Sequence, residues 1–168
     1  MKTKMMTIIQ IRPATEDDTY PILDIVAPPL AAGDTYAVRS DLDDAAVLAY
    51  WLGPTHEVFV AECDGNILGT YYLMANQQGG GDHVANCGYM TAHNARGKGI
   101  ARAMCEHSLE RARERGFRAM QFNHVVSTNT GAIALWRKLG FEIVGTLPEA
   151  FRHPEHGYVD SYVMFRSL

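Results

Sequence analysis

The chain has 168 residues and a mass of 18.6 kDa, a length that predicts one domain over residues 1–168. With 47% hydrophobic and 20% charged residues, the composition excludes a disordered or fibrous chain. The net charge of −4 argues against binding to nucleic acid or to an anionic membrane surface, since both attract basic proteins.

Two helices are expected near the N-terminus. Thr15 followed by Asp18 resembles a capping box that begins the first helix, at about 15–25, and Pro28 and Pro29 should end it. Ser40 or Asp41 should cap the second helix, which should stop before a Gly-Pro pair.

The remaining elements alternate between strands and helices. An Asp64-Gly65 turn between two β-rich runs predicts a hairpin. Gly116 suits the position directly after the end of a helix. The order βααβββαβαββ predicts a mixed α/β fold around one largely antiparallel sheet. The expected ranges are strands at 8–12, 57–62, 67–74, 83–91, 117–126, 141–147 and 158–165, with further helices at 100–115 and 130–139.

The three cysteines form no CxxC pair, so neither a disulfide framework nor a zinc ribbon is expected. Met1–Gln10 lacks the apolar core of a signal peptide, and no apolar run approaches the roughly 20 residues of a membrane span. His153 and His156 lack a third ligand at a recognisable spacing, so no metal is expected. These features predict a cytoplasmic protein with reduced thiols.

The most informative segment follows the strand at 83–91. Glycines at 97 and 99 allow left-handed backbone and close approach, and the helix that begins there presents unpaired N–H groups. That combination binds a phosphate or pyrophosphate, with Arg96, Lys98 and Arg102 adding positive charge. The letters fit neither a Walker A loop, which needs Lys-Ser/Thr after the last glycine, nor a GxGxxG dinucleotide loop.

Residues 96–101 match the Arg/Gln-x-x-Gly-x-Gly/Ala signature of the GNAT-type N-acetyltransferases. Downstream, residues 129–141 resemble the same family's Asn-x-x-Ala-x-x-x-Tyr/Trp-x-x-x-Gly-Phe block. The two blocks occur in the family's order, separated by one strand. The chain therefore resembles a GNAT acetyltransferase from about Ile8 to its end, most clearly between His83 and Phe141.

The resemblance implies that the strands at 83–91 and 117–126 splay apart and that acetyl-CoA enters the gap. Gly88 within a β-rich run independently indicates a bulge or a close backbone approach. Asn129 is expected to hydrogen-bond the cofactor arm. By carry-over, the other cofactor-binding residues are Met90 and Thr91, through backbone contacts to pantetheine, and Arg96, Gly97, Lys98, Gly99, Ile100 and Ala101, around the pyrophosphate.

The resemblance also implies direct attack of an amine on the thioester in a ternary complex. Many relatives place at position 136 a Tyr that protonates the departing thiolate; Trp136 cannot do so, because an indole N–H is a donor only. We therefore give Trp136 a packing or cofactor-contact role in the catalytic region; another group serves as the acid, or the thiolate leaves unassisted. Asn123 resembles the asparagine that orients substrate in fungal enzymes that acetylate proline analogues.

Candidates for the general base or its water relay are Asp34, Glu57, His83 and His124. Strand alternation places Asn123 and Val125 on one face and Phe122 and His124 on the other, which argues against His124.

The acceptor pocket should be shaped by two loops. Asp34 and Tyr36 lie in the loop between the first two helices, and Arg152, in a loop at 151–158, could hold a carboxylate.

The predicted function is transfer of acetyl from acetyl-CoA to the amine of a small molecule or amino-acid-like acceptor. The alternatives are a protein N-terminal acetyltransferase and a CoA-binding sensor without turnover. Neither metal, nucleic acid nor membrane is an expected partner. Homodimers through the last strands, which the resemblance suggests, remain open.

Overall fold

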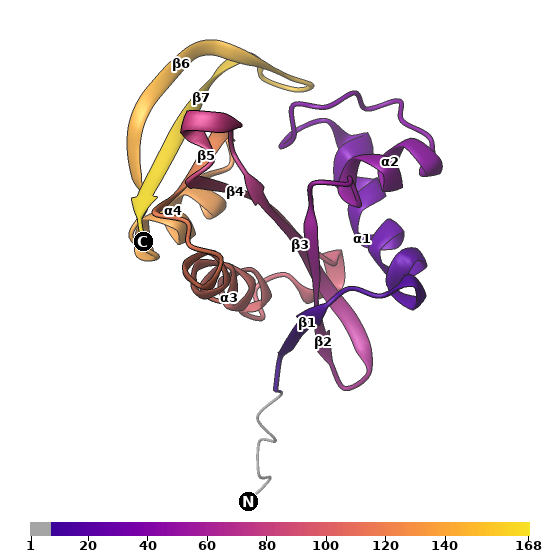
Figure 1. The fold of residues 1–168 in the computed structure, drawn as a ribbon. Coiled ribbons are helices and arrows are strands. Elements are labelled where there is room, and N and C mark those ends of the chain that lie inside the picture. The colour runs from indigo at the N-terminus through magenta and orange to yellow at the C-terminus, as the bar shows by residue number, and fades with distance from the viewer. Residues whose placement is uncertain (1–7) are drawn as a thin grey trace, which may run out of the picture.

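The computed structural model describes residues 8–168, so most of the segment considered as a signal peptide lies outside the described residues. One sheet runs through the molecule in the order β1-β2-β3-β4-β5-β7-β6, and every neighbouring pair is antiparallel except β4–β5 (Figure 1). The strands are β1 (Gln10–Pro13), β2 (Glu57–Cys63), β3 (Asn66–Ala75), β4 (Val84–Thr91), β5 (Ala119–Val126), β6 (Glu142–His153) and β7 (Gly157–Ser167).

The helices are α1 (Thr19–Ala32), α2 (Asp44–Trp51), α3 (Ile100–Glu114) and α4 (Thr130–Lys138). In Figure 1, α1 and α2 lie on one side of the sheet, and α3 and α4 lie on the other. Two clusters of buried side chains correspond to these two layers, one including Ile22, Val47 and Met90 and the other including Met104 and Phe122. The predicted mixed α/β fold and its element order are confirmed.

Both N-terminal helices differ in detail from the prediction. α1 continues through Pro28 and Pro29 and ends at Gly33, whose φ is +67°. Two helical N–H donors are lost at the prolines, but the helix continues through them to bury Leu30 in the core. The cap of α2 is Asp43, whose side chain accepts the N–H of Ala46 at 2.8 Å, so the caps expected at residues 40 and 41 were wrong.

The predicted capping box is present at the N-terminal corner. The Asp18 carboxylate accepts the backbone N–H of Thr15 at 2.8 Å and two N–H groups of Arg12 at 2.7 and 2.9 Å. Arg12 also donates to Glu62 on β2 at 2.8 Å. The hydrogen bonds from Arg12 lower the pKa of Asp18 to about 2. The buried Asp18 carboxylate therefore holds the start of α1 against the sheet through these hydrogen bonds.

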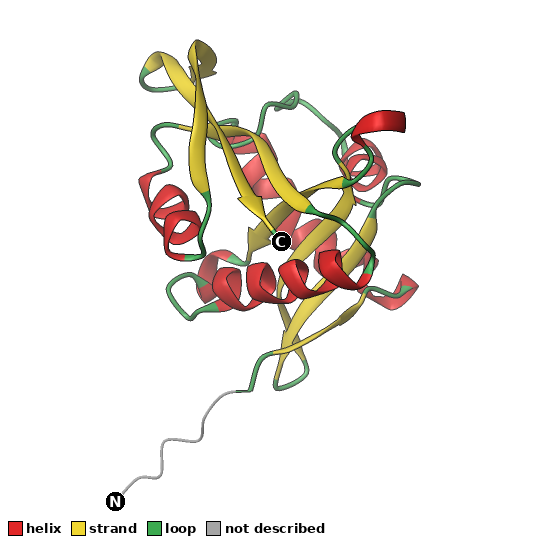
Figure 2. Ribbon diagram, turned by 60° about the vertical axis from the view of Figure 1, so that its left-hand side comes forward, coloured by secondary structure: helices red, strands yellow, loops and turns green. Residues whose placement is uncertain are grey.

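Residues 151–158 form a hairpin tip, not the loop that the sequence predicted. β6 continues to His153 and β7 begins at Gly157, with register pairs from His153↔Gly157 to Phe151↔Val159. Figure 2 shows this hairpin extending beyond the helices. At the turn, Nδ1 of His153 accepts the backbone N–H groups of Glu155 and His156. Within residues 8–168 no group of three or more His, Cys, Asp or Glu side chains could hold a metal ion.

Candidate functional site

The sheet opens between β4 and β5. These two parallel strands share only the register pairs Val84↔Ala119 and Ala85↔Met120. Beyond that point β4 remains paired with β3 as far as Thr91, and β5 is paired with β7. Residues 86–91 therefore present a free backbone edge toward β5. We call the space between the two diverging strands the β4–β5 gap.

The backbone groups on this edge follow from strand alternation. The N–H of Ala92 donates to Leu68 on the β3 side, whereas the carbonyl of His83 accepts Arg118 on the β5 side. In a regular antiparallel ladder the N–H and C=O of one residue point the same way and successive residues alternate. The β5-facing peptide groups are consequently those of the odd-numbered residues Cys87, Tyr89 and Thr91.

This geometry corrects one predicted contact. The backbone of Met90 faces Thr70 on β3, so it does not lie on the free edge, and the side chain of Met90 is buried against α1 and α2. Tyr89 and Thr91 offer the backbone groups instead. The sequence motif pointed to this strand, and the register with β3 shows which of its residues face the gap.

Gly88 makes a close approach rather than a bulge. The β3–β4 register continues without a shift from Gly69↔Thr91 to Ala75↔Ala85. A Cβ on Gly88 would lie 2.5 Å from Cε1 of Tyr72, because the Tyr72 ring lies over this glycine. Of the two alternatives that the sequence left open, the structure selects the close approach.

Tyr36 connects the loop between α1 and α2 to the gap. Its hydroxyl donates to the carbonyl of Tyr89 at 3.0 Å, and that carbonyl lies on the free edge of β4. Burial raises the pKa of Tyr36, which keeps the phenol protonated and able to donate. The loop residue predicted near the acceptor therefore lies directly at the gap.

Trp136 forms part of the gap's wall on the α3–α4 side. Its ring centroid lies 5.1 Å from that of Tyr89 on β4 and 5.2 Å from that of Phe122 on β5, and Trp136 is only 8% exposed. The indole thus packs between the two diverging strands, in agreement with the packing role considered above.

The loop after β4 has the backbone of an anion site. Gly97 and Gly99 have φ values of +74° and +82°, and a Cβ on either would meet nothing within 4 Å. The N–H groups of Lys98 and Ala103 bond to Ala95 and Gly99, respectively. Within residues 8–168, no protein acceptor receives a hydrogen bond from the backbone N–H groups of residues 97, 99, 100, 101 and 102. These amides, with the N-terminus of the 15-residue helix α3, fit the pyrophosphate of acetyl-CoA.

Asn129 caps α4 instead of standing free. Its side-chain oxygen accepts the N–H of Ala132 at 3.4 Å, which leaves its Nδ2 as the group that can donate to a cofactor arm. The predicted hydrogen bond is therefore sterically compatible with a structural role for the same side chain.

Asn123 lies on the opposite face of the sheet from α3 and α4. Its Nδ2 donates to Oδ1 of Asn76 at 2.6 Å, and its Oδ1 accepts Nε2 of Gln121 at 2.9 Å. Asn76 follows the end of β3, so this amide cluster bridges the closed end of the gap. Sequence reasoning missed Asn76 because only strand pairing brings it beside β5.

The alternation expected on β5 is wrong. Phe122 and Val125 are both buried in the α3–α4 cluster, and the β5–β7 register shifts between them. This β-bulge places two residues, Asn123 and His124, between successive inward-facing positions. The argument that separated His124 from Asn123 therefore fails.

The other predicted acceptor and base residues are dispersed. Glu57 is occupied on the α3 side, where it pairs with Arg111 at 2.6 Å and Arg115 at 2.5 Å. Arg152 is exposed in the hairpin, opposite Tyr158. Asp34 is half-buried at the start of the loop after α1.

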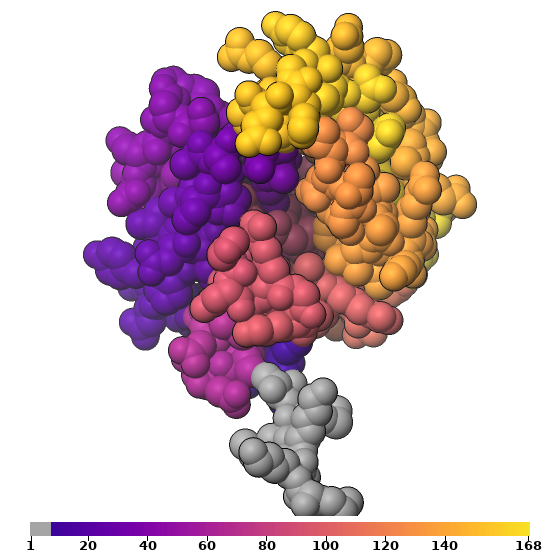
Figure 3. Space-filling model, turned by 180° about the vertical axis from the view of Figure 1, so that it is seen from behind, coloured from indigo at the N-terminus to yellow at the C-terminus, as the bar shows by residue number. Residues whose placement is uncertain are grey.

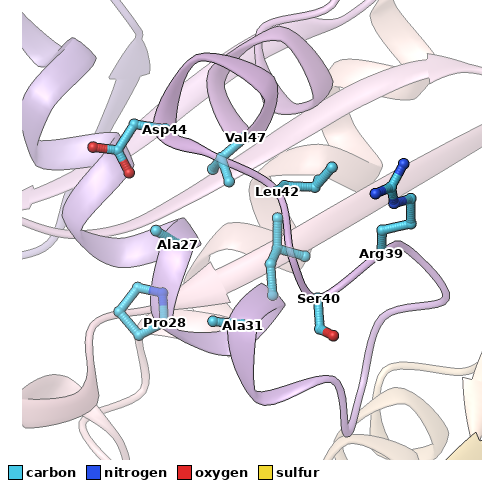
Figure 4. Close-up of a pocket in the computed structure, with 9 residues that line it drawn as sticks. Ala27, Pro28, Ala31, Arg39, Ser40, Leu42, Asp44 and Val47 are labelled. Carbon is cyan, nitrogen blue, oxygen red and sulfur yellow. The ribbon is translucent and has the colours of Figure 1, made fainter.

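Two hollows lie elsewhere on the molecule, and neither is lined by residues of β4 or β5. One of about 290 Å³ lies between the second half of α1 and the segment leading into α2, with Arg39 and Ser40 beside apolar side chains (Figure 4). The other, of about 570 Å³, runs between α3 and the end of α4 and includes Arg102 and Lys138. Figure 3 shows the surface hollowed between the α1–α2 region, the start of α3 and the α4 region.

The cysteines do not resemble nucleophiles. Cys63, Cys87 and Cys105 are all buried and free. Burial raises the pKa of Cys87 and raises that of Cys105 to about 12, so both thiols stay protonated near neutral pH.

A sheet that diverges beside an anion-binding helix start defines an acyl-CoA-binding class of fold. The family model described as Acetyltransferase (GNAT) family matches residues 22–141. The structure of a GCN5-related N-acetyltransferase from Kribbella flavida superposes with a TM-score of 0.90 at 44% identity, covering 95% of this chain and 98% of that one. The chain belongs to the GNAT family of acetyltransferases, and solved complexes of this fold hold acetyl-CoA.

Two further relatives bear on the acceptor. The L-amino acid N-acetyltransferase AaaT of Escherichia coli K12 is 30% identical over 163 residues, which cover 96% of this chain and 99% of AaaT. A ribosomal-protein-alanine N-acetyltransferase from Brucella melitensis has a TM-score of 0.82 at 30% identity, covering 95% and 99% of the two chains. The match to N-acetyltransferase aca1 of Schizosaccharomyces pombe, 36% identical, spans 58% of this chain but only 47% of aca1.

Proposed function

We propose that this protein transfers the acetyl group of acetyl-CoA to the amine of a small, amino-acid-like acceptor. The observation that carries the proposal is the free edge of β4, whose odd-numbered peptide groups lie beside the amides at 97–102. An extended pantetheine arm can pair with such an edge as an added strand would, while the pyrophosphate rests on the start of α3.

The chain's own groups account for the chemistry once the thioester supplies an activated acetyl. A backbone N–H on the free edge, from Cys87 or Tyr89, can polarise the thioester carbonyl and stabilise the negative charge that develops on its oxygen. Holding the amine about 3–3.5 Å from that carbon supplies further acceleration as effective molarity. No side-chain nucleophile is needed.

A small acceptor is supported by the polar face at the closed end of the gap. Asn123, Asn76 and Gln121 form a chain of amides there, and amides can bind both a carboxylate and an ammonium group. The likeness to AaaT, an L-amino acid N-acetyltransferase that this chain matches along nearly its whole length, supports the same class of acceptor.

The test is thiol release from acetyl-CoA across a panel of L-amino acids, proline analogues, polyamines, aminoglycosides and short peptides. We expect acceptor-dependent release with at least one free amino acid or its analogue. Binding of acetyl-CoA without release for any acceptor would overturn the transferase and leave a CoA-binding sensor.

Asn123 provides a sharper test of the acceptor site. Asn123→Ala should raise KM for the acceptor while leaving acetyl-CoA affinity within twofold of the wild type, because Asn123 lies on the face away from α3. Asn66→Ala is the matched control, since Asn66 begins β3 at the far hairpin and bonds only to Asp64. A KM for the acceptor within twofold of the wild type for Asn123→Ala would remove Asn123 from the site.

A second acceptor class rests on the likeness to the ribosomal-protein-alanine N-acetyltransferase of Brucella melitensis. Under that alternative, peptides with an N-terminal alanine would be acetylated and free alanine would not. Comparing these two substrates at equal concentration separates the two functions.

We also infer a cytoplasmic location and a homodimer. The three unpaired thiols support the first, and the exposed apolar residues Val144 and Leu147 on the edge strand β6 support the second. Within residues 8–168 no helix is long and apolar enough to cross a membrane. Cell fractionation and light scattering test the two inferences.

A further inference from the structure

Two buried polar atoms in the C-terminal half have nothing to bond to. Within residues 8–168, Nδ1 of His124 and Oγ of Ser161 are the buried side-chain nitrogen or oxygen atoms without a hydrogen-bond partner. Ser161 is 0% exposed. Leaving a buried donor or acceptor unsatisfied costs about 1–3 kcal/mol, so each of these two atoms calls for a functional explanation.

The β5 bulge places the two atoms on the same side of the sheet. Val126 is the register partner of Ser161, and directly opposed side chains project from one face. His124 precedes Val126 by two residues and so shares that face, while Val125 points into the α3–α4 core. This is the face on which Asn123 bonds to Asn76.

The surroundings of His124 are apolar on one side and polar on the other. Its ring centroid lies 6.0 Å from that of Phe151 on β6, at an interplanar angle of 61°. On the other side, its sequence neighbour Asn123 belongs to the cluster of amide side chains that also includes Asn76 and Gln121. On β7, the carboxylate of Asp160 is occupied, because it accepts the N–H of Glu149 at 2.9 Å. The other titratable side chains on β6 and β7 are those of Glu142, Glu149, Arg152, His153, Tyr158, Tyr162 and Arg166.

We propose that His124 receives the proton of the acceptor's ammonium group, through a water molecule held between Nδ1 of His124 and Oγ of Ser161. The inference rests on the proposed acetyl transfer and adds its missing base. Water at a polar site needs two to four partners, and these two atoms with the incoming amine provide three. A serine hydroxyl can donate or accept, so it can orient the water in either direction.

The proton balance is simple. An R–NH₃⁺ acceptor loses one proton to the water, which passes one of its own to Nδ1, and His124 becomes an imidazolium. The neutral amine then forms the C–N bond at the thioester carbon while the C–S bond breaks and its electron pair leaves on sulfur. The thiolate takes the second amine proton, and the imidazolium returns the first to solvent. The products are the amide, the free thiol and one proton.

The other groups in the region are poorly suited to this task. Burial raises the pKa of Tyr36 and that of Tyr72, so both phenols remain protonated at neutral pH. Glu57 is bound by two arginines on the opposite face. An imidazole is the side chain whose ordinary titration range lies closest to neutrality.

The test combines three variants with the wild type. His124→Asn keeps a polar group near the position of Nδ1 but cannot titrate, and Ser161→Ala removes only the hydroxyl. His107→Asn is the matched control, since His107 lies on α3, on the other side of the sheet, where its Nδ1 is hydrogen-bonded to the hydroxyl of Tyr71. For each protein, the measurements are acetyl-CoA affinity, melting temperature and the pH profile of kcat/KM with the best acceptor of the panel.

We expect His124→Asn to lower kcat/KM at pH 7 by about 100-fold or more, the usual contribution of a general base. The acid limb of the pH profile should move upward toward the pKa of the free amine, because only neutral amine would then react. Ser161→Ala should lower kcat/KM by at least about fivefold without a fall in melting temperature, since it removes an unsatisfied buried hydroxyl. All variants should bind acetyl-CoA like the wild type.

The outcomes separate the two proposals. If the wild type transfers acetyl and His124→Asn retains both its rate within twofold and its acid limb, the relay is overturned and the transferase stands. If the wild type transfers acetyl to no acceptor, the proposed function fails and the relay with it. Should His124→Asn not fold, His124→Gln and the profile of Ser161→Ala decide the same question.

Discussion

The two halves of the sheet differ in regularity. From β1 to β4 the strands pair with a single register shift, between Ala61 and Glu62, and side chains are buried on both faces. From β5 to β6 the pairing shifts three times, once between β5 and β7 and twice between β6 and β7. The gap lies where the regular half meets the irregular one.

This contrast shows how a stable sheet can carry a reactive site. The regular half holds β4 rigidly from one side, so its other edge can remain free without collapsing. The irregular half points side chains such as Asn123 and His124 out of the normal alternation, toward the face where an acceptor would lie. Four substitutions test whether the two halves of the sheet have these different roles.

The largest effect on stability is expected where the regular half is packed most tightly. Gly88→Ala places a Cβ 2.5 Å from Tyr72, and overpacking of this kind costs about 3 kcal/mol. Urea unfolding measures the loss. Gly80→Ala, in open space, is the control, and Tyr72→Val in the same chain should restore part of the loss. An unchanged midpoint for Gly88→Ala would mean that the Tyr72 ring is not held over β4.

The next effect concerns the anion loop. Gly99→Val puts a β-branched residue at a φ of +82° and disturbs the amides at the start of α3. Losing one charge-assisted hydrogen bond of about 1.5–3 kcal/mol weakens acetyl-CoA binding by about 10- to 100-fold. Calorimetry should find this loss for Gly99→Val and normal affinity for Gly65→Val, which suffers similar strain at a φ of +76° in a distant turn. Equal acetyl-CoA affinities for the two variants would mean that the pyrophosphate does not bind at the loop that contains Gly99.

The regular half should also show a specific dependence on acid. Asp18→Asn removes the charge that binds Arg12 and should cost about 2 kcal/mol, the range for hydrogen bonds to charged groups. The pKa of Asp18 is lowered from 3.8 to about 2, so the stability it contributes is present above pH 4 and is lost as the pH falls from 4 through 2.

The Asp18→Asn variant should lose less stability than the wild type as the pH falls from 4 to 2. Asp41→Asn, in an exposed pair with Arg39, serves as the control and should leave the unfolding midpoint nearly unchanged, because solvent screens an exposed ion pair. Parallel acid curves for wild type and Asp18→Asn would contradict the assignment.

The smallest effect is expected at the edge of the gap. Tyr36→Phe removes the hydrogen bond to the carbonyl of Tyr89, at a cost of about 1 kcal/mol. If this bond positions the loop over the acceptor, KM for the acceptor should rise while acetyl-CoA affinity changes less than twofold. Tyr20→Phe, on the exposed side of α1, should change neither quantity. A larger change in acetyl-CoA affinity than in KM would place Tyr36 in the cofactor site.

The sequence predicted the glycine turn before α3 and the order of elements because these depend on short-range features. Glycines at 97 and 99 are required by a positive φ, and a helix begins directly after them. It could not predict that α1 would continue through Pro28 and Pro29, since burial of Leu30 in the core outweighs the local preference. Nor could it predict the hairpin at 151–158, because strand pairing with residues beyond the turn decides that conformation.

The sequence by itself determined the family and the glycine turn before α3, because each is written in residues close together in the chain. Only the tertiary structure decided which residues of β4 face β5, that Asn76 reaches Asn123, and that a bulge brings His124 to the face that carries Asn123. The physical reason is that side-chain direction in a strand reverses with every residue, so a single bulge set by a distant partner exchanges inside for outside.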